Sequence, residues 1–324
     1  ATLTIVPELP EVETIRRQLD PLLRNCTIVQ AWAFESPKFT QAHDAVGWQL
    51  DGVRRRGKYL LMNLDSPAGK RELPARKREL IVHLGMTGRL SVSSNAQDQN
   101  TLDHQNRLDA RNSLHATNIS AASPQNSWAE SAAVDPADSS SLRHLRAVWT
   151  LDDGRCLYFD DVRRFGRIAV VADAEYHSLA TLAALGPEPF DDSFTPEYLR
   201  AQINSSKRCI KTQLLAQRVV AGLGNIYVDE ALWRSQVHPA AKRLSVMQSK
   251  KLRDDIRDVL SAAINNGGTT LRNYRDAAGA TGSNQRYLDC YGRAGQDCLR
   301  CGSTLRRIVI DARATVYCPS CQKR

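Results

Sequence analysis

The sequence predicts an α+β protein of several domains, with a β-rich N-terminal half and a helical C-terminal half. The chain has 324 residues, a length that favours about two domains with separate cores. Short apolar runs of β character fill the first half, and helical patterns fill 195–265. Two Cys-x2-Cys pairs close the chain. We expect a β-sandwich with a leading helix, then a helical domain that ends in a metal-bound β-hairpin.

The leading helix is predicted to begin near Pro10, because proline suits a first helical position. Glu11 and Glu13 suit the positive end of the helix dipole. One apolar stripe is made by Val12, Ile15, Leu19, Leu22 and Leu23. The helix should pack on a core through this stripe, with its N-terminus directed toward Pro7.

Seven short β runs follow and predict a two-layer β domain. A hairpin turn is expected at Asp153-Gly154. Lys58 opens the third run on the same side as Leu60 and Met62, where a lysine commonly marks a domain edge with its amine reaching outward. The runs lie at 27–34, 46–53, 58–64, 80–84, 146–151, 156–160 and 167–172.

The net charge of +9 is typical of proteins that bind polyanions, and it is also found in proteins that are merely basic. No stretch approaches the roughly 18 consecutive apolar residues of a membrane span, and no secretion signal is recognisable. We expect a cytoplasmic protein, associated with the nucleoid if nucleic acid is its partner.

Two segments interrupt the β pattern. Residues 66–79 hold five basic and two acidic residues, as in a basic hairpin loop. Residues 91–141 contain eleven serines, six acidic residues and two arginines. This composition buries too little apolar surface to offset the entropy of ordering, so we predict a disordered insertion. Its acidic charge argues against contact with nucleic acid.

In the helical half, a glycine-rich turn precedes a helix at Gly222-Leu223-Gly224. Such glycines free backbone N–H groups to bind a phosphate, and Asn225 adds a side-chain donor. A Gly-x-Gly turn also fits an ordinary helix junction. Lys207 and Lys211, upstream of the turn, are candidates for further phosphate contacts.

The four cysteines at the C-terminus predict one structural Zn²⁺ ion, because two Cys-x2-Cys pairs at this spacing suit a tetrahedral site without an open position for water. Disulfides and redox activity are the alternatives. The pairs are Cys298 with Cys301 and Cys318 with Cys321. Residues 286–324 hold eight basic and three acidic residues. Four thiolates and one Zn²⁺ ion together contribute a charge of −2, which leaves a net charge of about +3 on residues 286–324.

The run Pro7-Glu8-Leu9-Pro10-Glu11-Val12-Glu13-Thr14 resembles the N-terminus of the formamidopyrimidine-DNA glycosylase family. That family excises oxidised purines and nicks the strand with its terminal proline. The resemblance spans 7–64, 80–90, 142–190 and 196–324. It implies double-stranded DNA with oxidised bases as the partner of a protein that we expect to be a monomer.

The resemblance implies four catalytic residues. Pro7 would attack the sugar as a secondary amine, and Glu8 would supply the proton for ring opening and base loss. Lys58, within Gly57-Lys58-Tyr59-Leu60-Leu61, and Arg313, between the cysteine pairs, would hold phosphates through β- and δ-elimination. Glu11 has no role that the motif defines.

The resemblance also implies residues that bind DNA. Met86, Arg163 and Phe165 would fill the space left by an everted nucleotide. The Met86 thioether and the Phe165 ring would fill the gap in the base stack, and the Arg163 guanidinium would donate hydrogen bonds to the unpaired base. His144 lies near a family position that contacts DNA. Residues 219–230 resemble the helix-two-turn-helix element of the family, with Asn225 at its helix start.

The resemblance and the changes in composition along the chain predict the same domain boundaries. The boundaries are 1–6 as extra N-terminal residues, 7–190 as the β-sandwich domain with the insertion 91–141, 195–285 as the helical DNA-binding domain and 286–324 as the zinc finger.

Pro7 can act only as the first residue of the mature chain, because an internal proline nitrogen is an amide. Six residues precede it here. Val6 takes the place of the initiator, and a GTG codon can start translation as Met, so an upstream start-site assignment explains the extension. Later trimming, or a true extension that abolishes the lyase chemistry, are the alternatives.

The motif favours oxidised purines, because Leu9 stands where the sister endonuclease-eight branch, which acts on oxidised pyrimidines, usually has glycine. Residues 276–289 depart from the family pattern and make the choice of lesion less certain. The rival hypothesis is a noncatalytic zinc-ribbon protein that binds damaged DNA, with Pro7 blocked by the extension.

Overall fold

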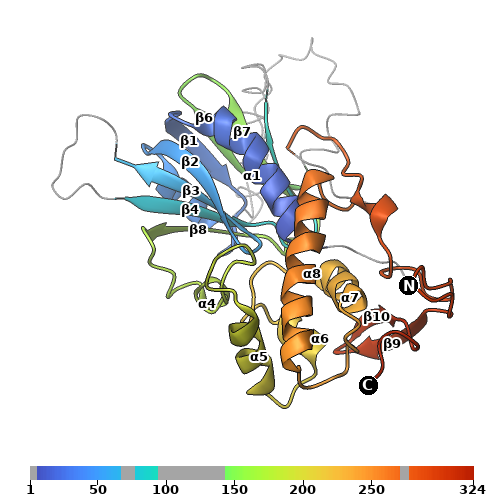
Figure 1. Cartoon of the computed structure of the whole chain (residues 1–324). Helices are drawn as coiled ribbons and strands as arrows, with labels where there is room; N and C mark the ends of the chain where they lie inside the picture. Colours follow the sequence, from blue (N-terminus) through green and yellow to red (C-terminus); the bar gives the residue numbers. More distant parts are fainter. Residues whose placement is uncertain (1–5, 67–76, 94–142, 271–276) are drawn as a thin grey trace, which may run out of the picture.

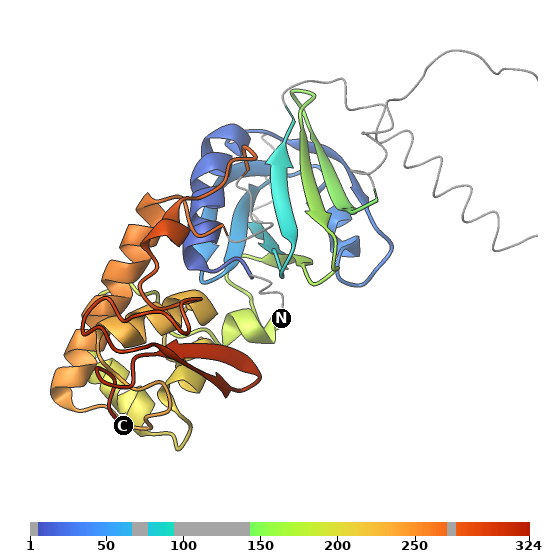
Figure 2. The same cartoon turned by 90° about the vertical axis from the view of Figure 1, so that its right-hand side faces the viewer.

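The computed structural model describes residues 6–66, 77–93, 143–270 and 277–324. They form two lobes, a β-sandwich and a helical domain that carries a β-hairpin (Figures 1 and 2). Helices α1 and α8 lie side by side where the lobes meet (Figures 1 and 2). The predicted α+β architecture is therefore confirmed.

The sandwich consists of two four-stranded sheets, whose neighbouring strands are all antiparallel. One sheet has the order β1 (Ile28–Ala33), β6 (Leu145–Leu151), β7 (Cys156–Asp161) and β5 (Gly88–Val92). The other has the order β2 (Gln49–Arg56), β3 (Tyr59–Asp65), β4 (Arg78–His83) and β8 (Arg167–Ala172). The core between them contains Trp149, Phe39 and Phe159, all fully buried.

Each of the seven predicted β runs corresponds to a strand, and the turn at Asp153-Gly154 joins β6 to β7. The prediction missed β5, which continues to Val92 and so extends past the expected start of the insertion. Residues 94–141 of that insertion and 67–76 of the basic segment lie outside the described residues. Lys58 is not a strand residue, because Gly57 and Lys58 form the turn between the paired Arg56 and Tyr59.

Helix α1 (Leu9–Leu23) belongs to both lobes. Val12, Ile15 and Leu19 pack in the sandwich core as their spacing predicts, whereas Leu9 packs in the core of the helical domain. Glu8 and Glu11 form a capping box at its start. The first turn of α1 is thus fixed at the interface of the two domains.

The helical domain supplies the surface against which that first turn packs. It consists of α5 (Pro196–Asn204), α6 (Ile210–Leu215), α7 (Asn225–Arg234) and α8 (Val246–Asn265), with the short η3 (Asn284–Tyr287) beyond α8. The short α4 (Ala180–Ala183) belongs to the sandwich, because its Leu182 packs with Leu61 and Ile81 of the β2–β3–β4–β8 sheet. A further 3-10 helix, η1 (Thr40–Ala45), belongs to the sandwich. No helix among the described residues is long and apolar enough to cross a membrane.

The final hairpin pairs β9 (Arg306–Ile310) with β10 (Arg313–Tyr317). Its two-residue turn, Asp311 and Ala312, has positive φ angles at both positions, as a tight hairpin requires. Arg313 is therefore held next to the tip of the hairpin.

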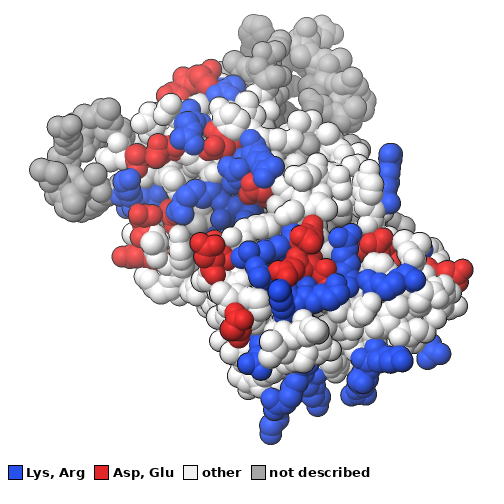
Figure 3. Space-filling view, in the orientation of Figure 1, with Lys and Arg blue, Asp and Glu red and all other residues white. Residues whose placement is uncertain are grey.

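A network of charged side chains joins the domains on the face formed by α1 and α8. Glu188, on the segment between the domains, accepts hydrogen bonds from the Gly57 N–H at 2.7 Å and from Arg56 at 3.0 Å. Arg55 lies 2.7 Å from Glu188 and 3.2 Å from Glu13 of α1. Acidic and basic side chains are interspersed on this face (Figure 3).

Candidate active site at the domain interface

Glu8 is the side chain that links the N-terminal motif to the helical domain. Its carboxylate accepts hydrogen bonds from the backbone N–H of Gly224 at 2.6 Å and of Ile226 at 3.0 Å. These amides lie at the start of α7, where the helix dipole favours an anion. A residue at the beginning of the chain therefore caps a helix more than two hundred positions away.

The environment of Glu8 allows its carboxyl group to hold a proton near neutral pH. Burial raises the pKa of Glu8 to about 7, while the Lys58 ammonium and the two backbone N–H groups oppose the shift and Glu11 adds to it. A carboxyl group with such a pKa is suited to act as a general acid at physiological pH.

Lys58 and Glu8 both lie against the Cα atom of Gly224. A Cβ atom on Gly224 would lie 2.3 Å from Glu8 Cδ and 2.6 Å from Lys58 Nζ, so only glycine leaves both side chains their space. Lys58 is 8% exposed. Burial lowers its pKa, an effect that Glu8 and Glu11 oppose and that the charge of Arg313 reinforces. Burial therefore moves the amine toward its neutral form.

Pro7 and Arg313 complete this group of predicted residues. Pro7 is buried and directly precedes Glu8, and its nitrogen forms the peptide bond to Val6. Arg313 is exposed at the start of β10, close enough for its charge to act on Lys58. The structure thus brings together residues from the segment that leads into α1, the β2–β3 turn, the start of α7 and the hairpin.

Glu11 is a central residue of the site that the sequence did not explain. Its carboxylate accepts hydrogen bonds from the Glu8 N–H at 2.9 Å, the Tyr227 hydroxyl at 2.5 Å and the Thr269 N–H at 2.7 Å. Burial raises its pKa, and these donors oppose the shift. The Glu8-x-x-Glu11 spacing of a capping box was the signal that could have identified the bond to Glu8.

The predicted phosphate cradle at the glycine-rich turn requires a correction. The N–H groups of Gly224 and Ile226 already bind Glu8, and the Gly222 N–H binds the Gln217 side chain at 2.9 Å. The Asn225 amide donates to the Ala314 carbonyl of the hairpin at 3.0 Å. That bond uses one of the two amide hydrogens of Asn225.

Lys211, predicted as a phosphate contact, has no exposed surface, and its side chain is not accessible to a phosphate in this structure. Its ammonium lies 2.6 Å from Asp229 Oδ1 and donates to the Ala314 carbonyl at 3.3 Å. The other oxygen of Asp229 accepts from the Val316 N–H at 3.0 Å. This buried pair ties β10, and with it Arg313, to α6 and α7.

The remaining predicted DNA-binding residues lie on surface loops. Phe165 is 48% exposed, and the Arg163 guanidinium stacks 4.8 Å from the centre of its ring. Met86 is half-buried in the loop between β4 and β5. His144 is half-buried just before β6, and Lys207 is exposed before α6.

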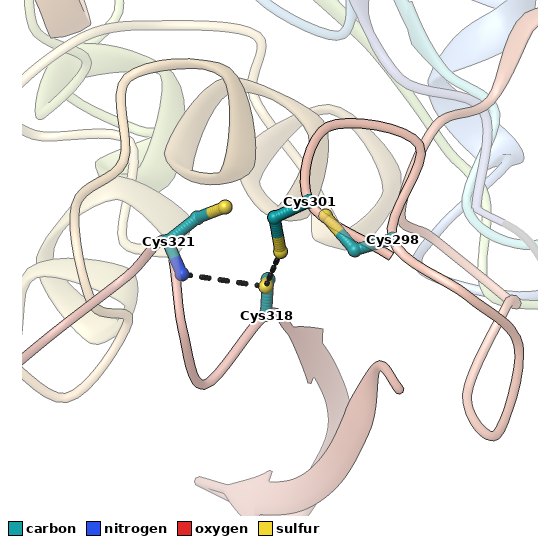
Figure 4. A group of neighbouring side chains, drawn as sticks. All are labelled: Cys298, Cys301, Cys318 and Cys321. Atoms are coloured by element: carbon teal, nitrogen blue, oxygen red, sulfur yellow. Dashed lines mark hydrogen bonds between the residues drawn. The ribbon is translucent and has the colours of Figure 1, made fainter. Parts of the chain in front are cut away.

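The four C-terminal cysteines form a metal site (Figure 4). Their sulfur atoms all lie within 4.8 Å of one another. The Cys301 and Cys318 sulfurs are 3.5 Å apart, too far for a disulfide. One pair of cysteines precedes β9 and the other pair follows β10. Four thiolates in this arrangement suit a tetrahedral Zn²⁺ ion.

We expect loss of zinc to unfold the hairpin, because thiolate–zinc bonds supply much of the folding energy of such small units. Cys318→Ser should lower the melting temperature and expose the other three thiols to a colorimetric thiol reagent. Cys209→Ser, outside the cluster, is the control and should change neither. A Cys318→Ser protein with unchanged melting and thiol reactivity would contradict a structural role for the ion.

Models of known protein families match both domains and the final hairpin. The family described as formamidopyrimidine-DNA glycosylase N-terminal domain matches residues 6–168, and its H2TH domain matches 185–275. The zinc finger found in FPG and IleRS matches 295–324, which assigns the four cysteines as a zinc site.

Whole-chain relatives extend the match. The formamidopyrimidine-DNA glycosylase of Deinococcus radiodurans is 38% identical over 323 residues, which cover 98% of this chain and 97% of that protein. That of Herpetosiphon aurantiacus is 38% identical over 326 residues and covers 98% and 100%.

Solved structures show the same fold. MutM (Fpg) of Thermus thermophilus superimposes with a TM-score of 0.75 at 34% identity, covering 98% of both chains. A Lactococcus lactis Fpg mutant in complex with a Fapy-dG containing DNA gives 0.74 at 28% identity, covering 98% of this chain and 100% of that one. The match of fold, domains and sequence over nearly the whole chain shows that this protein belongs to the formamidopyrimidine-DNA glycosylase family.

Proposed function

We propose that this protein is a base-excision repair enzyme that removes oxidised purines from double-stranded DNA and then cleaves the strand as an AP lyase. The observation that carries the proposal is the position of Glu8, a buried carboxyl group with a pKa of about 7 that directly follows Pro7 and lies beside Lys58. The names of the relatives and the Fapy-dG complex of the Lactococcus protein support the choice of substrate.

The chemistry requires Pro7 as a free secondary amine. Its nitrogen attacks C1′ of the damaged nucleotide, and the bond from C1′ to the base breaks as the base takes the proton that the amine loses. Glu8 gives its proton to the ring oxygen as the C1′–O4′ bond opens, which leaves a cationic iminium. Pro7 lies at the N-terminus of α1, and the positive end of the helix dipole favours the neutral amine over the ammonium.

Strand cleavage follows because the iminium withdraws electrons from the sugar. Loss of a C2′ proton breaks the C3′–O3′ bond, and a second elimination breaks the C5′–O5′ bond. Lys58 and Arg313 would hold the phosphates through these steps, because cationic side chains form strong hydrogen bonds with phosphate oxygens. Met86, Arg163 and Phe165 would occupy the space left by the everted nucleotide. His144, Lys207 and Asn225 would make further contacts with the DNA.

Borohydride trapping tests the proposal directly. Protein that begins at Pro7 should form a covalent adduct with a duplex that contains 8-oxoguanine, because borohydride reduces the iminium. Protein that begins at Ala1 should form none, since its Pro7 nitrogen is an amide. A matched duplex with thymine glycol should give a weaker signal. Binding without any adduct from the Pro7 form would support the noncatalytic DNA-binding alternative instead.

A further inference from the structure

Asp161, the last residue of β7, connects two loops that lie far apart in the sequence. Its side chain is fully buried. One oxygen accepts hydrogen bonds from the Thr87 hydroxyl at 2.5 Å and the Arg163 N–H at 3.2 Å, and the other accepts from the Gly166 N–H at 2.6 Å. Thr87 follows Met86, whereas Arg163 and Gly166 flank Phe165. One carboxylate therefore holds the bases of both loops.

The backbones of these loops are packed so closely that side chains are excluded at the contact. A Cβ atom on Gly85, which has a φ angle of 62°, would lie 2.5 Å from the carbonyl carbon of Phe165. A Cβ atom on Gly166 would lie 2.6 Å from the ring of Phe159 and 3.0 Å from Asp161 Oδ2. The two loops thus form one packed unit around the carboxylate.

The tips of the same loops are exposed. Phe165 is 48% exposed with Arg163 stacked on its ring, and Arg164, between them, has a φ angle of 57°. Thr87 strengthens the connection, since its hydroxyl also accepts from the Arg163 N–H at 3.0 Å. The tips would therefore depend on Asp161 and Thr87 for a fixed relative position.

We propose that Asp161 is a positioning residue that locks the Met86 loop and the Arg163–Phe165 loop into one rigid wedge for nucleotide eversion. This inference rests on the proposed function, since it assigns these side chains to the space that an everted nucleotide leaves. An ionised carboxylate suits the position because all three of its partners are donors. An asparagine would turn an amide N–H₂ toward at least one of these donors and lose that bond.

The test compares Asp161→Asn with unchanged protein, both beginning at Pro7 and loaded with zinc. We expect excision of 8-oxoguanine from a duplex to fall by about 100-fold, because small misplacements of positioning groups have effects of that size. Cleavage at a preformed abasic site in single-stranded DNA should stay within about twofold, since no base has to be everted there. The fluorescence of 2-aminopurine placed beside the lesion rises when the nucleotide is everted. Asp161→Asn should not produce this rise.

Two further variants separate positioning from folding. Thr87→Val removes the hydroxyl and should reproduce part of the defect, while Thr87→Ser keeps it and should restore normal excision. Asp173→Asn, exposed just beyond β8, is the matched control. Equal losses of duplex excision and abasic-site cleavage in Asp161→Asn, or no loss of either, would overturn the inference.

The proposed function and this inference can fail separately. If unchanged protein forms no trapped adduct and cleaves no abasic site, the proposed enzyme activity is wrong. The 2-aminopurine signal then decides the role of Asp161 alone. A rise in unchanged protein that disappears in Asp161→Asn supports the wedge, and identical signals from the two proteins refute it.

Discussion

Glu8→Gln is expected to lower the rate of 8-oxoguanine excision by about 10²- to 10⁴-fold, the range typical for loss of a general acid. Glutamine has the length of glutamate and can still accept a bond from one of the two N–H groups at the start of α7. It has no proton to give to the sugar oxygen. Single-turnover excision by protein that begins at Pro7 measures the effect.

Two comparisons make the result specific. Glu175→Gln changes an exposed carboxylate before α4 and should leave excision unchanged. Trapping of Glu8→Gln on a preformed abasic site should be affected less than excision, because an open-chain sugar aldehyde is available there without base loss or ring opening. Excision by Glu8→Gln at the normal rate would show that another group delivers the proton.

The same assignment predicts how excision depends on pH. Because the pKa of Glu8 is raised to about 7, its acid form is present below pH 7 and is lost above it. The excision rate constant should therefore fall by up to tenfold per pH unit on the alkaline side. Protonation of the Pro7 amine should produce an acidic limb. If the excision rate began to fall near the ordinary glutamate pKa, burial would not be raising the pKa of the group that supplies the proton.

Signals carried by neighbouring residues predicted most of the fold. The seven β runs and the leading helix depend on local alternation and on one apolar stripe, and the zinc site depends on two short spacings. Strand β5 was missed because it is short and adjoins the segment that breaks the pattern. Leu9 was not expected in the helical core, since periodicity shows which face of a helix is apolar and not which domain covers it.

The partners of the site residues could not be predicted in the same way. Glu8, Lys58 and Arg313 were named through resemblance, but the use of the α7 amides by Glu8 depends on a contact between distant segments. Lys211 has the same residue type as Lys207, and only the fold shows that one is buried against Asp229 and the other is exposed. Charge in a sequence therefore indicates a polyanion partner without showing which cations face it.

Lys211→Met is expected to cost about 3 to 5 kcal/mol of unfolding free energy, because it leaves a buried partner without its counter-ion. Asp229 would remain as the unpaired group, still bonded to the Val316 N–H. The loss should loosen the attachment of β10 and weaken cleavage through Arg313. Denaturant unfolding at neutral pH measures the stability, and the ratio of δ- to β-elimination products measures the effect on Arg313.

Acid should partly rescue this variant. Burial already raises the pKa of Asp229 to about 6, against the opposing charge of Lys211, so its pKa rises further once that charge is gone. The group then binds a proton in the folded state at a pH where it is ionised in the unfolded chain. Stability is retained at low pH and lost as pH rises through the folded pKa, which is higher in Lys211→Met than in unchanged protein. The difference in stability between the two proteins should therefore shrink as pH falls toward about 6, where Asp229 of the unchanged protein also binds a proton, and stay constant below that pH. The double variant Lys211→Met with Asp229→Asn should regain much of the loss at neutral pH, because a neutral amide needs no counter-ion and can still accept from Val316. A pH-independent loss that the second substitution does not relieve would show that packing of the lysine stem, and not its charge, stabilises the hairpin.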